Sequence, residues 1–253
     1  MRPAFLLRLL DPVGSAIARQ LARPRGWFGR AVMTRVLNRG NRDLIEATLD
    51  GVGLGPGCRL LDVGFGGGLL LELAQRRGVR SLAGVDPSEA AVAWLRSRRD
   101  TRAGSELRLE VGVAEALPFP DASFDVVAST NTVYFWPDLA RAFSELHRVL
   151  EPGGLLTVGF SGAAKLRRFA GITRHGFSFH DGGELVDAAT RAGFANVRLA
   201  VLHGRVTEGD YVLRGSASAT PACSSSATWR TSRWTSTAWR PCVSRRCSVA
   251  RTT

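Results

Sequence analysis

Lysine, long apolar runs and paired cysteines are nearly absent from this 253-residue chain. Lys165 is the single lysine among 34 basic residues. No run of 18 apolar residues occurs, so the sequence predicts no helix that spans a membrane. The four cysteines form no Cys-x-x-Cys pair and no cluster with histidine at zinc spacing, so we expect no metal site. Sparse cysteine and the lack of a recognisable secretory signal favour a cytoplasmic location.

Acidic residues are also missing from the C-terminal stretch, so the net charge of +12 is divided unevenly. Residues 1–40 carry eight arginines and one acid, and residues 215–253 carry six arginines and no acid. The 20 basic and 21 acidic residues between them nearly cancel. The middle of the chain therefore lacks a broad basic face that could follow phosphates, and we do not expect a nucleic-acid substrate.

Composition divides the chain into three parts. Residues 1–50 are expected to form an N-terminal helical cap, because residues 3–22 carry an apolar stripe at helical spacing. Packing on the main domain, a lid over a substrate and peripheral contact with a membrane surface are the alternatives for this stripe. Residues 51–214 form the main domain. Residues 215–253 contain no Leu, Ile, Phe or Met, which predicts a disordered tail; a frame-shifted terminus and a nucleic-acid-binding tail are alternatives.

From residue 59 the pattern alternates between short apolar strands and amphipathic helices. This alternation predicts an α/β fold with a parallel sheet and helices on both faces, and the closing pair of strands predicts one antiparallel edge strand. Strands are expected at residues 59–63, 81–85, 106–111, 124–129, 155–160, 197–203 and 211–214, and helices at 41–50, 69–77, 88–99, 137–150 and 181–192.

The strongest local motif is a glycine loop between the first strand and the helix that follows it. It reads Asp62-Val63-Gly64-Phe65-Gly66-Gly67-Gly68. A nicotinamide-binding loop needs a further glycine at position 69, which is Leu, and a phosphate loop needs Gly-Lys-Ser/Thr, which is absent. Asp62 would repel a pyrophosphate but attract a cation. The loop therefore favours a ligand with an ammonium and a sulfonium over a dinucleotide.

Asp86 ends the second strand, 22 residues after Gly64. A carboxylate at about this distance past a glycine loop suits hydrogen bonds to two ribose hydroxyls. Taken alone, Asp86 could instead cap the helix that begins at Ser88. With the glycine loop before it, we expect the ribose role.

Four motifs in this order resemble the class I S-adenosylmethionine-dependent methyltransferases, in particular the type 11-like subgroup that acts on small molecules. The motifs lie at residues 62–68, 85–88, 114–125 and 148–154. The resemblance covers residues 59–160 well and 161–214 loosely. It implies a Rossmann-like, seven-stranded, mostly parallel sheet with N-terminal helices before it, and S-adenosyl-L-methionine as the cofactor.

The resemblance also implies roles for the matching positions. Asp62 and the glycines would hold the methionine part, and Asp86 would hold the ribose. Ala114 and Glu115 would meet the adenine, and Asn131 would face the transferable methyl group. The implied cofactor-binding residues are Asp62, Gly64, Gly66, Gly68, Asp86, Pro87, Ala114, Glu115 and Asn131.

One position departs from the family pattern. The family often has Asp directly before the Ala-Glu pair, where it bonds the adenine amino group. Val113 stands at that position here, after Gly112. That hydrogen bond is therefore lost or supplied by Glu115.

The acceptor side offers four candidate catalytic residues. The aromatic stretch after the fourth strand contains Asn131 and Tyr134, at the sheet end where ligands bind in open α/β folds. His175 and His180 follow the fifth strand, and either could accept a proton from an acceptor. Tyr134 could instead be a core residue, and each histidine could be a packing or surface residue.

The sequence thus predicts an S-adenosylmethionine-dependent methyltransferase that acts on O, N or C of a small-molecule acceptor. One alternative is a membrane-associated lipid or quinone-like acceptor, which the helix at residues 3–22 suggests. Another is a protein that binds S-adenosylmethionine without catalysis. The acceptor and the oligomeric state do not follow from the sequence.

Overall fold

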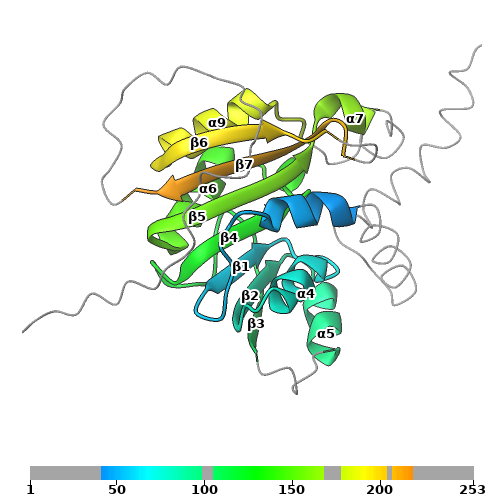
Figure 1. The fold of residues 1–253 in the computed structure, drawn as a ribbon, viewed down its shortest axis with the longest axis vertical. Helices are drawn as coiled ribbons and strands as arrows, with labels where there is room; N and C mark the ends of the chain where they lie inside the picture. The colour runs from blue at the N-terminus through cyan, green and yellow to red at the C-terminus, as the bar shows by residue number, and fades with distance from the viewer. Residues whose placement is uncertain (1–40, 99–104, 168–177, 204–206, 219–253) are drawn as a thin grey trace, which may run out of the picture.

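The computed structural model describes residues 41–98, 105–167, 178–203 and 207–218. The amphipathic stripe at residues 3–22, His175 and most of the expected tail lie outside these ranges. The described part is built on one seven-stranded sheet with the order β3-β2-β1-β4-β5-β7-β6 (Figure 1). Its strands are β1 (Arg59–Val63), β2 (Ser81–Asp86), β3 (Glu106–Val111), β4 (Phe124–Thr130), β5 (Leu150–Ser161), β6 (Phe194–Val201) and β7 (Asp210–Ala217).

Strand direction confirms the predicted, mostly parallel sheet. All pairs among β1 to β5 are parallel, whereas β7 runs antiparallel to both β5 and β6. The reversed strand β7 therefore lies one place in from the edge, and β6 forms the edge. The strand order changes direction between β1 and β4. In open α/β sheets, ligands bind beside the carboxyl ends of the strands at such a point.

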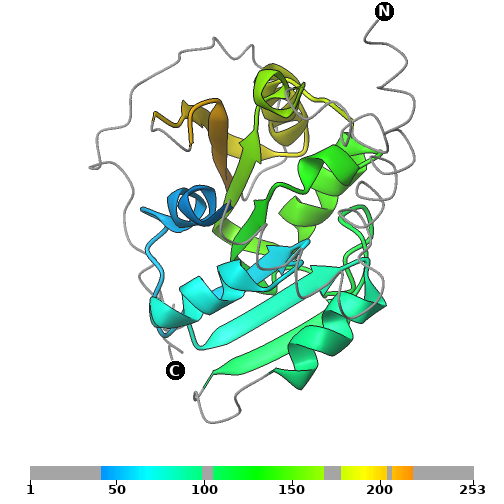
Figure 2. The same cartoon turned by 90° about the vertical axis from the view of Figure 1, so that its right-hand side faces the viewer.

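Helices cover both faces of the sheet, as predicted. The helix at residues 41–49, α4 (Leu69–Arg76) and α5 (Glu89–Ser97) share one apolar core with alternate strand residues such as Leu60. The helices α6 (Leu139–Val149) and α9 (Gly182–Arg191) share the other core with residues such as Leu61. Figure 2 shows helix 41–49 and α6 on opposite sides of the sheet. The short elements η2 (Val133–Phe135) and α7 (Ala163–Arg167) follow β4 and β5.

Several element ends differ from the prediction, most of them by one to three residues. β5 begins at Leu150 rather than at residue 155, because Leu150 already pairs with Phe124 across a register shift in β4. β6 spans residues 194–201 rather than 197–203, and β7 continues to Ala217, past the expected domain boundary at residue 214. Asp181 caps α9 as predicted, in a reciprocal capping box with Glu184.

Helix 41–49 is an integral layer of this domain. Gly159 of β5 leaves room for it, since a Cβ there would lie 2.1 Å from the Thr48 hydroxyl oxygen. The Thr157 hydroxyl donates to the Thr48 carbonyl (2.8 Å), and the Arg214 guanidinium donates to the Ala47 carbonyl (2.8 Å). The packed unit therefore includes residues that the sequence assigned to the cap.

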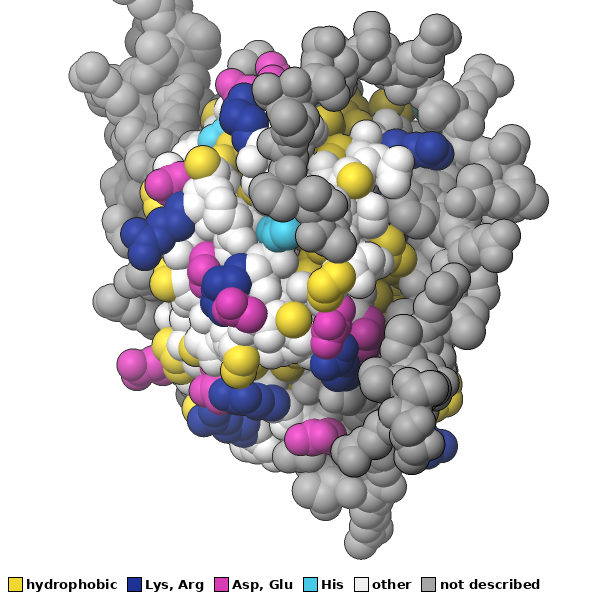
Figure 3. Space-filling view, turned by 90° about the vertical axis from the view of Figure 1, so that its left-hand side faces the viewer, with side chains coloured by type: hydrophobic (Ala, Val, Ile, Leu, Met, Phe, Trp, Pro, Cys, Tyr) yellow, Lys and Arg dark blue, Asp and Glu magenta, His cyan; other side chains and the backbone are white. Residues whose placement is uncertain are grey.

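The surface of the described part carries charges of both signs. Figure 3 shows lysine or arginine side chains directly beside acidic ones on one face. Among the described residues, Arg59 pairs with Asp125 (3.0 Å) and Glu151 (3.0 Å) near the amino ends of the strands. No helix among the described residues is long and apolar enough to cross a membrane.

The close approach at Gly159 predicts that Gly159→Ala destabilises the protein by about 1–3 kcal/mol, because the new methyl overpacks the site. Adding Thr48→Ala should recover part of that loss, since it removes the nearest atom. Chemical denaturation measures both effects. Gly57→Ala is the control, because nothing lies within 4 Å of the place that its new methyl group would take. Equal losses at Gly57 and Gly159 would contradict the packing argument.

Candidate functional site

The glycine loop joins β1 to α4 at the switch point of the sheet. Gly64, Gly66 and Gly68 all have positive φ angles (79°, 49° and 73°), which side-chain-bearing residues rarely adopt. A Cβ at Gly64 would also lie 2.3 Å from the Thr132 methyl carbon. The loop therefore requires glycine for its backbone shape and for its close contact with the end of β4.

Asp62 lies directly under this loop and lacks a full set of partners. Its side chain is 2% exposed, and Oδ2 is buried with no hydrogen-bond partner in the described part of the chain. Burial, with a smaller contribution from the nearby Asp86 carboxylate, raises the pKa of Asp62 well above its ordinary value. A buried carboxyl oxygen without a donor is costly, so the position favours a ligand that supplies one.

Asp86 holds the tip of the loop from the end of β2. Its Oδ2 accepts the Gly66 N–H (2.9 Å) and its Oδ1 accepts the Ser88 N–H (2.9 Å). Burial raises the pKa of Asp86, while these two hydrogen bonds oppose that shift. Both roles weighed from the sequence are compatible, because each carboxylate oxygen keeps a second lone pair for a hydroxyl. Pro87 follows, half-buried, between Asp86 and Ser88.

The loop at residues 112–123 begins beside Asp86. The Gly112 N–H donates to the Asp86 carbonyl (3.2 Å), which brings Ala114 and Glu115 to the same end of the sheet. Ala114 is buried, and Glu115 Oε1 is buried without a hydrogen-bond partner among the described residues. Val113 is 42% exposed beside them, so its apolar side chain is open to the surface of the site.

Asn131 forms the centre of a polar cluster at the carboxyl end of β4. It has a φ of 57°, and its Oδ1 accepts from the Tyr134 hydroxyl (2.9 Å) and the Ser161 N–H (3.2 Å). Its Nδ2 donates to Asn41 Oδ1 (3.1 Å), on the first described residue of helix 41–49. The Asn131 amide is therefore oriented by contacts from three separate elements.

Tyr134 joins this cluster to the buried core. The side chain is buried, and its hydroxyl also lies 3.0 Å from the Ser161 carbonyl. Burial raises the pKa of Tyr134, so the phenol stays protonated near neutral pH. This arrangement suits a residue that orients Asn131, and a catalytic role for Tyr134 stays a prediction.

Of the two histidines predicted as catalytic candidates, the structure describes only His180. His175 lies outside the described residues. His180 Nδ1 lies 3.5 Å from Glu184 Oε2, and its Nε2 is buried without a hydrogen-bond partner in the described segments. The Ser178 N–H donates to the Tyr134 carbonyl (2.8 Å), which brings the segment before α9 next to η2.

Sequence reasoning missed three residues of this region: Asn41, Ser161 and Asp210. Ser161 ends β5, and its hydroxyl donates to Asp210 Oδ1 (2.6 Å), while Lys165 pairs with Asp210 Oδ2 (2.7 Å). The strand ends were the only signal for Ser161 and Asp210. Asn41 is 90 residues from its partner, which no local pattern could indicate.

These features together fit S-adenosylmethionine, which the sequence implied. Asp62 and Glu115 each present a buried oxygen that lacks a donor, and the cofactor carries an ammonium and an adenine amino group. The open glycine loop leaves room for close approach of a ligand to the backbone. No group of three metal-ligating side chains occurs in the described ranges.

Several of the known proteins that resemble this chain are methyltransferases. Residues 61–158 match the family described as "Methyltransferase domain". The malonyl-[acyl-carrier protein] O-methyltransferase of Geobacter sulfurreducens is 34% identical over 185 residues, which are 67% of this chain and 65% of that protein. The demethylmenaquinone methyltransferase of Thermus thermophilus is 39% identical over 101 residues, which are 40% of this chain and 46% of that protein. The chain thus spans less than two thirds of the length of these relatives.

Solved structures show the same fold. An S-adenosylmethionine dependent methyltransferase from Mesorhizobium loti matches with a TM-score of 0.58 at 19% identity, over 70% of this chain and 97% of that one. The geranyl diphosphate C-methyltransferase of Streptomyces coelicolor, in complex with S-adenosyl-L-homocysteine, matches with a TM-score of 0.58 at 19% identity, over 78% and 85%.

The burial of Asp62 predicts a pH-dependent cost in the ligand-free protein. Because the folded-state pKa is raised, stability is lost as pH rises from the unfolded-state value near 4 toward the folded one. Asp62→Asn should therefore raise the melting temperature at pH 7, by a few degrees for each ~1 kcal/mol gained, and the gain should vanish toward pH 4. Thermal melts between pH 4 and 8 test this, with the exposed Asp187→Asn as control. A gain independent of pH would contradict it.

Proposed function

The chain belongs to the class I S-adenosylmethionine-dependent methyltransferases, and on that premise we propose that it methylates an oxygen, nitrogen or carbon atom of a small-molecule acceptor. One observation carries the proposal. Asp62, one residue before the end of β1, and Asp86, the last residue of β2, lie on adjacent strands beside a left-handed glycine loop. Asp62 keeps a buried oxygen without a partner among the described residues. A ligand with a cationic donor group for Asp62 and ribose hydroxyls for Asp86 would satisfy both carboxylates.

Each part of the site has a separate task in this proposal. Asp62 and the loop glycines hold the methionine ammonium and carboxylate, while Asp86 and Pro87 border the ribose. Ala114 and Glu115 border the adenine, with Glu115 Oε1 in place of the aspartate that Val113 replaces. When bound, the sulfonium of the cofactor supplies an electrophilic methyl carbon.

Asn131 and His180 are the proposed acceptor-side residues within the described ranges. The orientation of the Asn131 amide by Asn41, Tyr134 and Ser161 suits a group that positions an acceptor atom. The imidazole of His180 keeps Nε2 without a partner in the described part of the chain, so it could accept the proton that an O or N acceptor releases. His175 stays a candidate from the sequence.

The names of similar proteins do not single out one acceptor. Their names cite a malonyl-acyl carrier protein, a demethylmenaquinone and a geranyl diphosphate, so similar domains are associated with different acceptors. A lipid or quinone-like acceptor is the second candidate. It is favoured by the similarity to the demethylmenaquinone enzyme and by the amphipathic stripe at residues 3–22.

Cofactor binding is the direct test. We expect calorimetric titration of the full chain with S-adenosylhomocysteine to show saturable binding. Asp86→Ala should weaken it ~100-fold or more, because two charge-assisted hydrogen bonds and the support of Gly66 are lost. Asp187→Ala on the exposed face of α9 should bind like the wild type. A folded wild-type chain that binds neither S-adenosylmethionine nor S-adenosylhomocysteine would contradict the proposal, and binding without turnover across acceptor panels would favour the non-catalytic alternative.

Membrane contact separates the two acceptor classes. If the lipid-like acceptor is correct, the full chain should co-sediment with vesicles that contain anionic lipid, since arginines flank the apolar stripe. Deletion of residues 1–25 should abolish this and leave S-adenosylhomocysteine affinity unchanged. Full-length protein that stays in the supernatant would rule out the lipid-like acceptor.

A further inference from the structure

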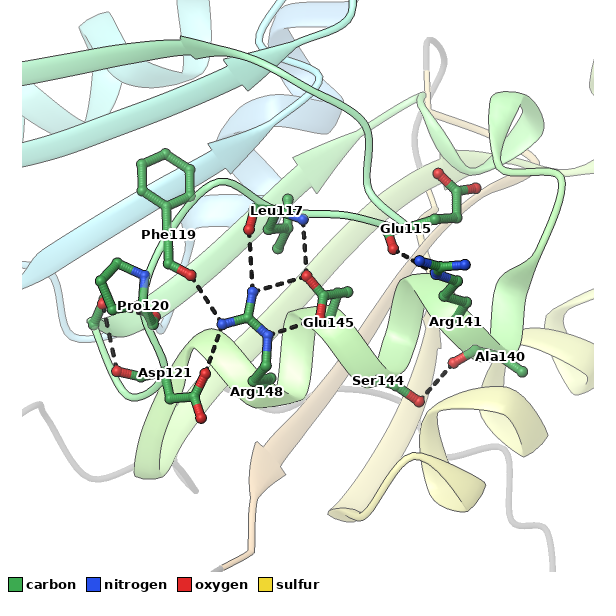
Figure 4. A network of polar contacts seen from close by, with 11 residues as sticks. Glu115, Leu117, Phe119, Pro120, Asp121, Ala140, Arg141, Ser144, Glu145 and Arg148 are labelled. Atoms are coloured by element: carbon green, nitrogen blue, oxygen red, sulfur yellow. Dashed lines mark hydrogen bonds and ion pairs between the residues drawn. The ribbon is translucent and has the colours of Figure 1, made fainter.

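One face of α6 presents three charged side chains to the loop at residues 112–123. Arg141, Glu145 and Arg148 are spaced four and three residues apart, so they lie on the same side of the helix (Figure 4). Buried apolar residues of the same helix, including Phe143 and Leu146, pack into the core. The loop therefore rests on a charged face of α6.

Arg148 uses its whole guanidinium on this contact. Its Nη1 donates to the Phe119 carbonyl (2.9 Å) and to Asp121 Oδ1 (2.7 Å). Its Nη2 donates to the Leu117 carbonyl (3.1 Å) and to Glu145 Oε2 (2.8 Å), and its Nε donates to Glu145 Oε1 (2.7 Å). These five hydrogen bonds match the five N–H groups of an arginine side chain.

Glu145 and Arg141 complete the attachment. Glu145 Oε2 accepts the Leu117 N–H (2.8 Å), and the Arg141 Nε donates to the Glu115 carbonyl (2.9 Å). The Arg148 guanidinium lowers the pKa of Glu145, so this carboxylate stays ionised near neutral pH. Three backbone carbonyls and one amide of the loop are thus bonded by side chains of α6.

The other polar supports of the loop lie toward its two ends. At its start the Gly112 N–H bonds to the Asp86 carbonyl, and Val113 forms a bridge with Ala116. At its end the Ala122 and Ser123 N–H groups donate to the backbone carbonyls of Arg148 (3.0 Å) and Val149 (2.8 Å). The side chains of Leu117 and Phe119 are buried in the apolar core, which anchors this part of the loop against the domain. Glu115 lies between these anchors, so its placement depends on the bonds from α6.

We propose that Arg148 is a positioning residue of the cofactor site, which locks the 112–123 loop onto α6 so that Ala114 and Glu115 are held ready to border the adenine. The inference rests on the proposed function, because it concerns the same cofactor. Arg148 itself bonds the loop at Leu117, Phe119 and Asp121, which follow Ala114 and Glu115 in the chain, and it also bonds Glu145. A group that orders a binding loop in advance lowers the ordering cost of binding.

Arg148→Lys tests this, because lysine keeps the charge and loses the planar fork. We expect affinity for S-adenosylhomocysteine to fall about tenfold, and the Leu117 amide to exchange its hydrogen faster in the ligand-free protein. Methylthioadenosine, which lacks the amino-acid part, should lose affinity by a similar factor. Glu145→Gln removes the partner charge and should weaken both ligands in the same direction, which keeps the test available if Arg148→Lys folds poorly.

Arg59→Lys is the matched control. Arg59 also forms a dense guanidinium cluster, with Asp125 and Glu151, but at the amino ends of the strands. The Arg59→Lys variant should have a lower melting temperature than the wild type. Its affinities for S-adenosylhomocysteine and methylthioadenosine, and the hydrogen exchange of its Leu117 amide, should be unchanged. If wild type binds S-adenosylhomocysteine and Arg148→Lys binds it equally well, the positioning role is wrong. If wild type binds neither ligand, the proposed function fails and the inference fails with it.

Discussion

The Asp86 carboxylate is the contact on which the ligand end of this protein depends. It accepts one backbone N–H from the glycine loop and one from the start of α5, while its own carbonyl accepts the Gly112 N–H. Three segments that leave three different strands are therefore tied to one residue. Since β2 is paired on both sides, with β1 and β3, the loops take their positions from a strand inside the hydrogen-bonded sheet.

Around this residue the protein places two carboxyl oxygens that its own described atoms leave without donors, on Asp62 and Glu115. Each such oxygen costs stability while no ligand supplies a donor. The apolar cores on both faces of the sheet, and the ion-pair clusters around Arg59 and Arg148, offset that cost elsewhere. The ligand-free site is thus locally destabilising, and the packed cores of the surrounding sheet and helices keep it folded.

Much of this arrangement follows from local sequence patterns. The strand and helix alternation, the glycine loop, Asp86 at the end of β2 and the Asp181 cap all depend on residues close together in the chain, and the structure places them as predicted. The contacts of Asn131 with Asn41 and of Arg148 with Leu117 join residues 90 and 31 positions apart. Such pairs depend on how helices settle on the sheet, so sequence periodicity could not reveal them. For the same reason, the sequence left open whether Tyr134 is a core residue or a catalytic one, because the partners of its hydroxyl come from other parts of the chain.

The reversed direction of β7 has a consequence for how such a domain can diversify. Because β7 runs against β5, its first residue, Asp210, meets the last residue of β5 at the ligand end of the sheet. The turn at residues 207–209, just before β7, is therefore at the rim of that end of the sheet, where the Gly162 N–H donates to the Gly209 carbonyl (2.7 Å), and it interrupts none of the parallel strands. Changes in the length of that turn can reshape the rim while the register of β1 to β5, and with it the cofactor cradle, stays the same.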